Sequence, residues 1–254
     1  MYYDTHAHLY LGHFDNDIDV VIRNAKEAHI DRIYLPNIDS STLDLMTALE
    51  SKDNDLFRSM IGLHPCSVKE GFENELIILE SLIEKYRFAG IGETGTDLYW
   101  DKSFRDEQII AFETHLDWGL KYDLPVIIHA RESMDLTIDI VRKKQNGNLK
   151  GIFHCFSGTY DDACQVIDLG FLMGIGGVIT YKKNDLVEII EKIELKHFVL
   201  ETDSPYLPPV PHRGKRNESS YLTFIAKKIA EIKNMTEEEI GQITSRNADR
   251  IFSF

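Results

Sequence analysis

The chain has 254 residues, of which 43% are hydrophobic and 28% are charged, and no stretch is rich enough in Pro, Gly or Ser to mark a long linker. These proportions are ordinary for a globular protein and give no indication of intrinsic disorder. The formal net charge of −14 argues against broad electrostatic binding to nucleic acid, because long phosphate backbones are held by extended basic surfaces. A phosphate-bearing substrate would have to be captured locally.

The length suits one (β/α)8 barrel, which typically takes about 250 residues. Short β-branched and apolar runs alternate with amphipathic stretches of helical length, a pattern that predicts repeated βα units and a parallel sheet. The runs predicted as strands are residues 2–5, 32–36, 58–63, 89–93, 126–129, 151–154, 171–174 and 198–201.

Helices are predicted between these strands because apolar residues recur three and four positions apart. The predicted helices include residues 17–28, 43–51, 75–86, 104–122 and 186–193. Two further helices follow the last strand, and Thr236 with Glu239 three residues later predicts a capping box at the start of the second. We therefore predict an α/β fold: a single (β/α)8 TIM barrel over residues 1–254, with room for distortion and with extra C-terminal helices.

An open doubly wound sheet is the alternative arrangement of alternating strands and helices. Such folds commonly carry a G-x-G-x-x-G turn after the first strand, where dinucleotide phosphates bind. No such turn follows residues 2–5, so the barrel is favoured.

The first residues carry neither the basic nor the apolar region of a secretory signal, and no apolar run approaches the ~20 residues that span a bilayer. Cys66, Cys155 and Cys164 are odd in number and lack C-x-x-C spacing, which favours reduced thiols over a disulfide framework or a zinc ribbon. We expect a cytoplasmic protein that does not bind a membrane, and nothing implies a stable protein partner.

The first candidate ligands lie in Asp4-Thr-His6-Ala-His8, at the end of the first predicted strand. Histidines two positions apart on an extended chain point their side chains the same way, so His6 and His8 can share one metal ion. The pair alone is a weak signal, because H-x-H also occurs by chance.

Four more candidate ligands fall at or near the ends of other predicted strands. Glu93 ends the fourth run, His129 the fifth and His154 the sixth. Asp203 lies two residues past the eighth. The carboxyl ends of all barrel strands face one mouth, where barrel active sites are built. Four imidazoles and two carboxylates can hold two divalent ions, one carboxylate bridging them; the alternative of merely hydrogen-bonded buried histidines would make this convergence an accident.

Seven short motifs extend in order over nearly the whole chain. They are Asp4-Thr-His6-Ala-His8-Leu9, Gly62-Leu-His64-Pro65, Gly92-Glu93-Thr-Gly95-Thr-Asp97, Leu124-Pro-Val-Ile-Ile-His129-Ala-Arg131, His154-Cys-Phe-Ser-Gly158, Leu200-Glu-Thr-Asp203-Ser-Pro205-Tyr206-Leu207 and Arg213-Gly-Lys-Arg-Asn217-Glu218. This ordered set resembles the TatD family of metal-dependent deoxyribonucleases, within the amidohydrolase-like barrel superfamily. Seven ordered motifs are far more specific than any one of them.

The resemblance implies two metal ions held by the six candidate ligands, with Glu93 as the bridging carboxylate. The two sets are His6, His8 and Asp203 for one ion and His129 and His154 for the other. It also implies phosphodiester hydrolysis, commonly the exonucleolytic removal of nucleotides from a DNA 3′ end. Many members of the superfamily bridge their metals with a carboxylated lysine on the fourth strand, so Glu93 in that place favours the TatD branch over the amide- and ester-hydrolysing branches.

Two residues are expected to act in the reaction itself. Asp203 is the predicted proton acceptor, since it would touch both metal and attacking water, and Glu93 is the predicted bridge. The metal ions are expected to be Mg²⁺, Mn²⁺ or Zn²⁺, because histidines suit zinc or manganese while relatives often work with magnesium. The predicted partner is a nucleic-acid substrate, in particular DNA ends, since local capture suits attack at an end better than tracking along a duplex.

Four residues depart from the family pattern. Where the family usually reads G-E-I-G-L-D-Y, this chain has Thr94, Thr96 and Leu98. Where the family has proline after Asn-Glu, this chain has Ser219. The candidate ligands are unaffected, so the departures bear on packing behind Glu93 and on substrate preference.

Basic residues near the candidate ligands are the predicted phosphate contacts, because arginine forks onto phosphate oxygens bidentately. They are Arg131, Arg213, Lys215 and Arg216. A solvated turn before a helix is the alternative for residues 213–216, and the resemblance favours phosphate binding. His64, at the end of the third predicted strand, is expected either to contact the scissile phosphate or to pack in a loop.

Two acidic residues are expected to support the ligands. Asp97 either orients a ligand or caps a helix. Glu201 is expected to hydrogen-bond a ligand imidazole, as carboxylates near metal sites commonly do, ahead of binding a further ion. The other histidines are expected to be structural or exposed, with the role of the last left open: His13, His29, His115, His197 and His212.

Two other functions stay open from the sequence. The same metal pair could hydrolyse amide or ester bonds, as in a deacylase acting on aminoacyl-tRNA, and a substrate panel separates this from nuclease activity. A metal-stabilised barrel that binds a nucleic-acid or protein partner without catalysis is the rival from another class. Inactivity with every metal tried would support it.

Overall fold

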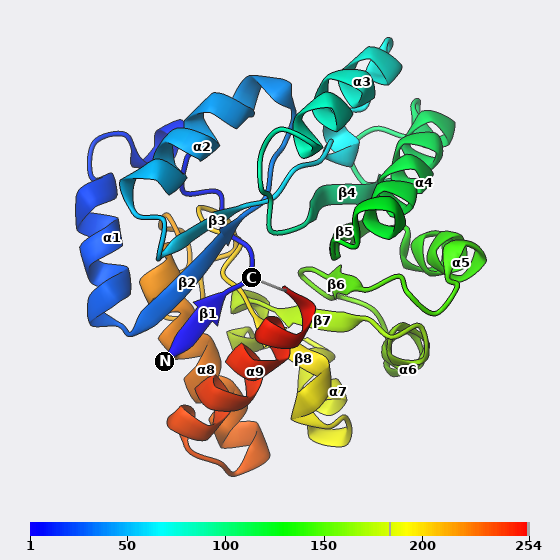
Figure 1. The fold of residues 1–254 in the computed structure, drawn as a ribbon. Helices are drawn as coiled ribbons and strands as arrows, with labels where there is room; N and C mark the ends of the chain where they lie inside the picture. The colour runs from blue at the N-terminus through cyan, green and yellow to red at the C-terminus, as the bar shows by residue number, and fades with distance from the viewer. Residues whose placement is uncertain (183, 253–254) are drawn as a thin grey trace.

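Parallel strands arranged in a ring form the centre of the fold (Figure 1). The computed structural model describes residues 1–182 and 184–252. In that part of the chain one sheet has the order β1-β2-β3 and the other the order β4-β5-β6-β7-β8, with every pairing parallel. The strands are β1 (Tyr2–Asp4), β2 (Ile30–Leu35), β3 (Phe57–Ser59), β4 (Ile91–Asp97), β5 (Val126–Arg131), β6 (Gly151–Phe153), β7 (Leu172–Ile175) and β8 (Phe198–Leu200).

Backbone hydrogen bonds join the two sheets at both seams. Ile61, just after β3, donates its N–H to the carbonyl of Gly90, just before β4, at 3.0 Å. Thr5, just after β1, donates its N–H to the carbonyl of Leu200 in β8 at 3.0 Å. The predicted (β/α)8 barrel is therefore confirmed, with these two seams as its irregular places.

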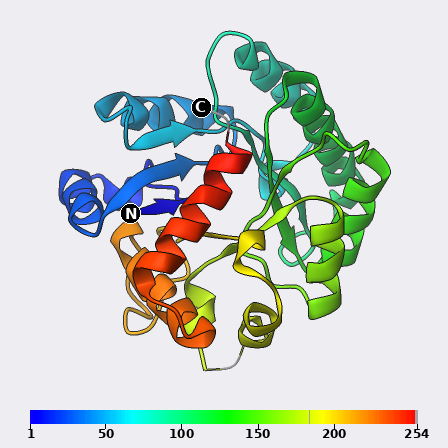
Figure 2. The same cartoon turned by 60° about the horizontal axis from the view of Figure 1, so that its bottom comes forward.

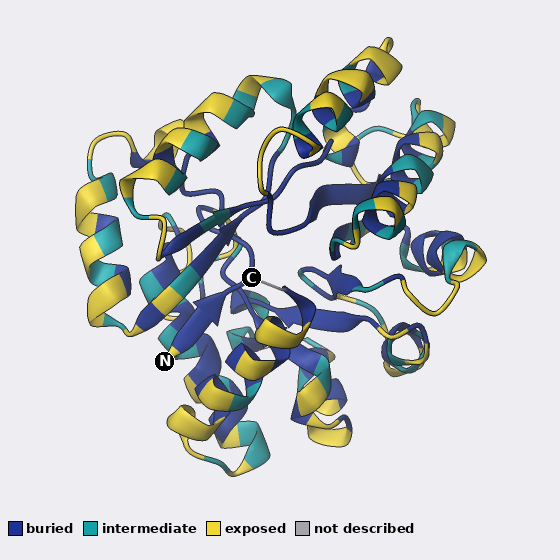
Figure 3. Cartoon of the chain, in the orientation of Figure 1, coloured by how far each residue is buried: buried dark blue, intermediate teal, exposed yellow. Residues whose placement is uncertain are grey.

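Helices cover the outside of the ring, and Figure 3 shows their solvent-facing sides exposed while the strands they cover are buried. Among the described residues one helix follows each strand, and α9 follows α8. The helices are α1 (Ile18–Glu27), α2 (Leu43–Lys52), α3 (Phe72–Ile83), α4 (Arg105–Tyr122), α5 (Met134–Lys144), α6 (Tyr160–Asp168), α7 (Leu186–Lys192), α8 (Leu222–Lys233) and α9 (Glu237–Ile251). Short 3-10 turns are η1 (Gly12–Phe14), η2 (Ser40–Thr42), η3 (Pro65–Ser67), η4 (Gly177–Thr180), η5 (Leu195–His197) and η6 (Ser219–Tyr221).

The last helix closes one end of the barrel (Figures 1 and 2). The Phe252 ring, just after α9, stacks on Tyr34 of β2 with ring centroids 3.8 Å apart. The Asn247 side chain donates to the carbonyls of Leu195 and Phe198, at the start of β8. These contacts place α9 against the amino end of β8. The carboxyl ends of the strands therefore form the open mouth. The apolar layer that α9 covers contains Tyr3, Tyr34, Met60, Ala89, Ile127, Ile152, Leu172, Val199, Ala248, Ile251 and Phe252.

Most predicted elements lie within a few residues of the observed ones, and the capping box is present, because the Thr236 hydroxyl accepts from the N–H of Glu239. The prediction of α3 as residues 75–86 is displaced. Its apolar face begins at buried Phe72, directly after the N-cap Gly71, whose left-handed φ of +80° is a conformation that glycine adopts without steric cost. The three cysteines are free, as predicted. Of the helices in the described ranges, none is long and apolar enough to cross a membrane.

The fourth strand differs from its prediction in a way that affects the site. The predicted run ends at Glu93, whereas β4 continues to Asp97. Its register against β5 shifts between Ile91 and Thr94, and such an irregularity bends a strand and redirects a side chain. Glu93 therefore lies within the strand, at the irregularity, and not at the strand end.

His115 is a structural histidine within α4. Its Nε2 accepts from the N–H of Leu63 at 3.0 Å, and its Nδ1 lies 2.6 Å from the carbonyl of Ala111, to which it donates. Burial lowers the pKa of His115 to about 4. Because an unfolded histidine has a pKa near 6.5, the unfolded state takes up the proton first as the pH falls.

We expect this histidine to make the fold less stable in acid. Its contribution to the free energy of unfolding is complete above pH 6.5 and is lost progressively toward pH 4. The loss reaches about 1 kcal/mol by pH 5.5. Urea unfolding in chelator at pH 7.5 and 5.5 measures it, with wild type compared with His115→Gln. From pH 7.5 to pH 5.5 the free energy of unfolding of the variant should fall by about 1 kcal/mol less than that of wild type. An equal loss in both proteins would contradict the assignment.

Candidate metal centre

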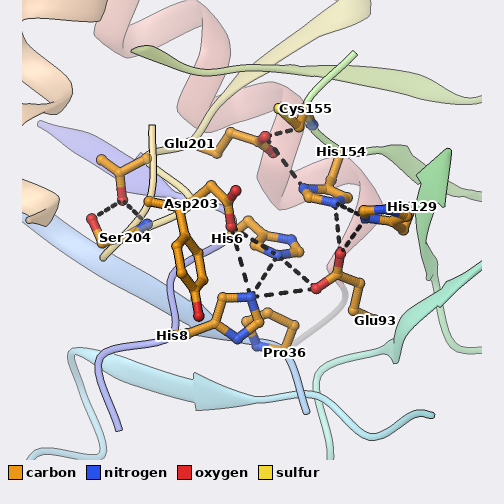
Figure 4. A network of polar contacts seen from close by, with 12 residues as sticks. His6, His8, Pro36, Glu93, His129, His154, Cys155, Glu201, Asp203 and Ser204 are labelled. Carbon is orange, nitrogen blue, oxygen red and sulfur yellow. Dashed lines mark hydrogen bonds and ion pairs between the residues drawn. The ribbon is translucent and has the colours of Figure 1, made fainter. Parts of the chain in front are cut away.

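The side chains predicted as metal ligands converge at the open mouth of the barrel (Figure 4). They come from the ends of β1, β5 and β6, from the irregular part of β4 and from the turn after β8. The structure therefore brings together all six predicted ligands: His6, His8, Glu93, His129, His154 and Asp203.

One oxygen of Glu93 faces the histidines of the first strand. Glu93 Oε2 lies 3.2 Å from His6 Nε2 and 3.3 Å from His8 Nε2. Asp203 Oδ1 approaches the same two nitrogens at 3.8 and 3.7 Å. Two imidazoles and two carboxylates thus surround one point at the mouth.

The other oxygen of Glu93 faces a second pair of histidines. Glu93 Oε1 lies 2.9 Å from His129 Nδ1 and 2.7 Å from His154 Nε2. The carboxylate therefore stands between two imidazole pairs and presents a different oxygen to each.

Within each pair the imidazole nitrogens also face each other. His6 Nε2 and His8 Nε2 are 3.3 Å apart, and His129 Nδ1 and His154 Nε2 are 3.1 Å apart. Two facing lone pairs repel unless a proton or a cation lies between them. Ions such as Zn²⁺ take nitrogen and oxygen donors at about 2.0–2.2 Å, which puts donors on one ion roughly 3 Å apart. The donor set fits, and these clusters indicate divalent metal binding.

Electrostatics keep the central carboxylate ionised. Burial would raise the pKa of Glu93, but the surrounding imidazoles of His154, His64, His6 and His129 hold that pKa well below its usual range. Asp203 behaves differently, because burial raises its pKa to about 6. Glu93 is thus a poor proton acceptor, and Asp203 is a better one than an ordinary carboxylate.

Asp97 orients one of the histidines. His129 donates from Nε2 to Asp97 Oδ2 at 2.9 Å, which leaves the Nδ1 lone pair facing Glu93. Burial raises the pKa of Asp97, but the hydrogen bond and charge of His129 lower it to about 2. Asp97 therefore takes the first of its two predicted roles. Gly95 permits the close pairing of β4 with β5 at His129, because a Cβ there, at φ +136°, would lie 2.1 Å from the backbone carbonyl oxygen of His129.

Tyr10 orients another histidine and was missed in the sequence. Its hydroxyl donates to the carbonyl of Pro36 at 2.6 Å and accepts from His8 Nδ1 at 2.9 Å. His8 must then carry its proton on Nδ1, so its Nε2 lone pair faces the centre. The signal was present, because residue 10 continues the two-residue alternation of His6 and His8.

Glu201 supports the turn beside His154. Its Oε1 accepts from the N–H of Cys155 at 2.5 Å and lies 3.6 Å from His154 Nδ1. That second separation is an ion-pair contact and too long for the expected hydrogen bond. Gly174 makes room for the carboxylate, because a Cβ there would lie 2.1 Å from Glu201 Oε2.

His64 also faces the central carboxylate, with its Nε2 3.5 Å from Glu93 Oε1. Its Nδ1 accepts from the N–H of Cys66 at 3.0 Å, so in the neutral ring the proton is on Nε2. His64 therefore points an N–H donor into the mouth, whereas the partners of His8 and His129 leave a lone pair of each of these two rings facing it.

The predicted phosphate contacts lie in different surroundings. The Arg131 guanidinium stacks on Tyr99, and that of Arg213 lies 4.4 Å from the Tyr181 ring centroid. Lys215 is exposed. All three belong to loops after strands on the mouth side or to the end of β5.

Arg216 is already bound within the protein. Its two terminal nitrogens donate to the two oxygens of Asp17, each at 2.7 Å, and its guanidinium lies over the Phe14 ring. This bidentate pair ties the loop after β8 to the start of α1. The fork that was expected to hold phosphate therefore holds a carboxylate.

The departures from the family pattern are mostly internal. Thr94 and Thr96 are buried, and the Thr96 hydroxyl hydrogen-bonds Ser133 Oγ at 2.8 Å and Thr137 Oγ1 at 2.7 Å. A polar cluster thus fills the space behind β4. Leu98 is half-buried, and buried Ser219 begins η6.

We expect Asp97→Asn to weaken metal binding about tenfold, because carboxylates that orient ligand histidines typically contribute 10–100-fold. Calorimetric titration of the metal-free protein with Mn²⁺ or Zn²⁺ measures the change. Asp101→Asn is the matched control, since Asp101 lies in the same loop and pairs with Lys69. Equal affinities in the two variants would contradict the role of Asp97.

Comparison with known proteins agrees over the full length. The profile of the family described as "TatD related DNase" matches residues 3–253. YabD of Bacillus subtilis (strain 168), described as an uncharacterized metal-dependent hydrolase, is 36% identical over 254 residues, covering 99% of each chain. YcfH of Escherichia coli (strain K12), with the same description, is 30% identical and covers 98% of this chain and 94% of its own. The crystal structure of YjjV, a TatD homolog from E. coli K12, matches with a TM-score of 0.93 at 26% identity, over 100% of this chain and 98% of that one.

Proposed function

This chain belongs to the TatD family of metal-dependent hydrolases, and we propose that it uses two divalent ions to hydrolyse phosphodiester bonds, removing nucleotides from DNA 3′ ends. The observation that carries the two-metal part is the position of Glu93, whose two oxygens each face a separate pair of imidazoles. The choice of DNA as substrate is supported by the family description and by the positively charged side chains of Arg131 and Arg213 at the mouth.

The proposed ligand sets follow this geometry. His6, His8 and Asp203 would hold one ion, and His129 and His154 the other. When bound, Mg²⁺, Mn²⁺ or Zn²⁺ would supply Lewis acidity toward the phosphoryl oxygens and make an attacking water more acidic.

The chain's own residues complete the reaction. Asp203 accepts the proton of the attacking water, which its raised pKa favours. His64 donates from Nε2 to a phosphoryl oxygen as negative charge develops there. Arg131, Arg213 and Lys215 hold phosphate groups, and Arg216 is left out because Asp17 occupies it. A long nucleic-acid backbone is held by an extended basic surface, and a net charge of −14 argues against one on this chain. This supports attack at chain ends.

The test is hydrolysis by metal-stripped protein to which Mg²⁺, Mn²⁺, Zn²⁺ or Co²⁺ is returned. Single- and double-stranded DNA labelled at the 5′ end should shorten stepwise, while DNA labelled at the 3′ end should release the label at once. An ester, an amide and an aminoacyl-tRNA go through the same assay. Cleavage of these but not of DNA would replace the nuclease proposal with the deacylase alternative. No product from any substrate with any metal would favour a non-catalytic barrel.

A further inference from the structure

Two neighbouring aromatic side chains lie exposed in the loop after β4. Tyr99 is 52% exposed and Trp100 is 69% exposed, and no large hydrophobic side chain in the described ranges is more exposed than Trp100. A single exposed apolar residue is ordinary on a protein surface. A Trp–Tyr pair beside a charged centre fits a ligand that has both an apolar face, which can stack on the rings, and a charged group.

The loop that carries both rings is hydrogen-bonded to Asp97, which also contacts a candidate ligand. Asp97 accepts from the backbone N–H groups of Tyr99 and Trp100 through Oδ1, at 3.0 and 3.3 Å. Its other oxygen, Oδ2, accepts from His129. One carboxylate thus fixes both the aromatic loop and a candidate ligand, so the rings stand beside the mouth.

A cation completes the arrangement. The Arg131 guanidinium carbon is 3.9 Å from the Tyr99 ring centroid and 5.3 Å from that of Trp100. The two rings are nearly perpendicular, at 87°, with centroids 4.8 Å apart. Arg131 lies two residues after His129 on β5. It therefore offers a positive charge against the two rings, at the end of the strand that carries His129.

The loop is held on its far side as well. Asp101 accepts from Lys69 Nζ at 3.0 Å and from the N–H of Ser103 at 2.9 Å. Lys69 also lies over the Phe104 ring, 4.9 Å from its centroid. A surface fixed before binding loses less conformational entropy when a ligand arrives.

We infer that Tyr99, Trp100 and Arg131 form a stacking platform for an unpaired nucleobase at the end of a nucleic-acid substrate. Every base has a flat π face, so aromatic stacking grips single strands without reading their sequence. Arg131 pairs with the phosphate next to that base. In a chain with net charge −14 this combination supplies local capture. The inference rests on the proposed function for its substrate class.

The test separates binding from hydrolysis. A short single-stranded DNA carries 2-aminopurine at its 3′ terminus, and its fluorescence is titrated with protein in the presence of chelator, so that nothing is cut. We expect quenching by wild type and about a tenfold higher Kd for Trp100→Ala and for Tyr99→Ala. Trp100→Phe should recover most of the affinity. Tyr86→Ala is the matched control, an exposed tyrosine (57%) away from this loop, and it should bind like wild type.

A second oligonucleotide has an abasic 3′ terminus. It should bind wild type about as weakly as the normal DNA binds Trp100→Ala, because the stacked group is gone in both cases. Unchanged Kd values for both alanine variants, or equal affinity for abasic and normal ends, would overturn the platform and leave these rings to a protein partner. If wild type quenches 2-aminopurine yet cuts no DNA with any metal, the platform stands and the proposed function fails.

Discussion

Replacing Asp203 by asparagine is expected to lower kcat about a thousandfold while the fold stays intact, because a general base typically contributes 10²–10⁴-fold. Asp203 Oδ1 lies 3.7–3.8 Å from the nitrogens of His6 and His8, and burial raises its pKa to about 6. The carboxylate is therefore both near the metal centre and basic enough to take a proton. An amide of the same shape cannot accept that proton.

The backbone at this position dictates the choice of asparagine. Asp203 has φ +56°, in the left-handed region, where Asn and Asp are both tolerated and other non-glycine residues are strained. Asp123 provides a matched control, because it also has a left-handed φ of +52° but caps the end of α4. Steady-state rates on the preferred DNA and thermal melts are compared for Asp203→Asn and Asp123→Asn. A near wild-type rate in Asp203→Asn would rule out its role as base.

Local patterning predicts most of the barrel because each βα unit repeats the same alternation. The departures arise where distant segments meet. The irregularity that places Glu93 inside β4 depends on the register against β5, which no window around residue 93 contains. The closure of the barrel end by α9 depends on a stack between Phe252 and Tyr34. Residues so far apart in the chain carry no shared local signal.

The site likewise contains residues that local sequence places correctly and contacts that it cannot predict. Ligands at strand ends could be placed because all parallel strands of a barrel present their carboxyl ends at one mouth. The partner of Arg216 could not be predicted. Arg216 is close in sequence to the mouth motifs, but that position gives no sign of Asp17, which lies at the start of α1. Tyr10 is intermediate: its alternation with His8 was visible, but its hydrogen bond needs the position of Pro36.

Glu93→Gln is expected to remove at least one metal ion per chain and to lower activity by more than about a thousandfold, because metal ions contribute several kcal/mol to the transition state. The wild-type carboxylate presents an acceptor oxygen to each imidazole pair. Glutamine has one oxygen and one NH₂ group. Whichever way the amide turns, one pair of imidazoles meets a donor that cannot bind a cation.

His64→Gln is the control for this change, because His64 faces the same Glu93 oxygen at 3.5 Å but presents an N–H donor. Metal content after desalting, measured by plasma mass spectrometry, should be two ions for wild type and His64→Gln and no more than one for Glu93→Gln. Activity should fall in both variants, which separates loss of metal from loss of a phosphoryl contact. Two tightly bound ions in Glu93→Gln would show that the carboxylate does not bridge, and one ion in wild type would show that the second imidazole pair serves another purpose.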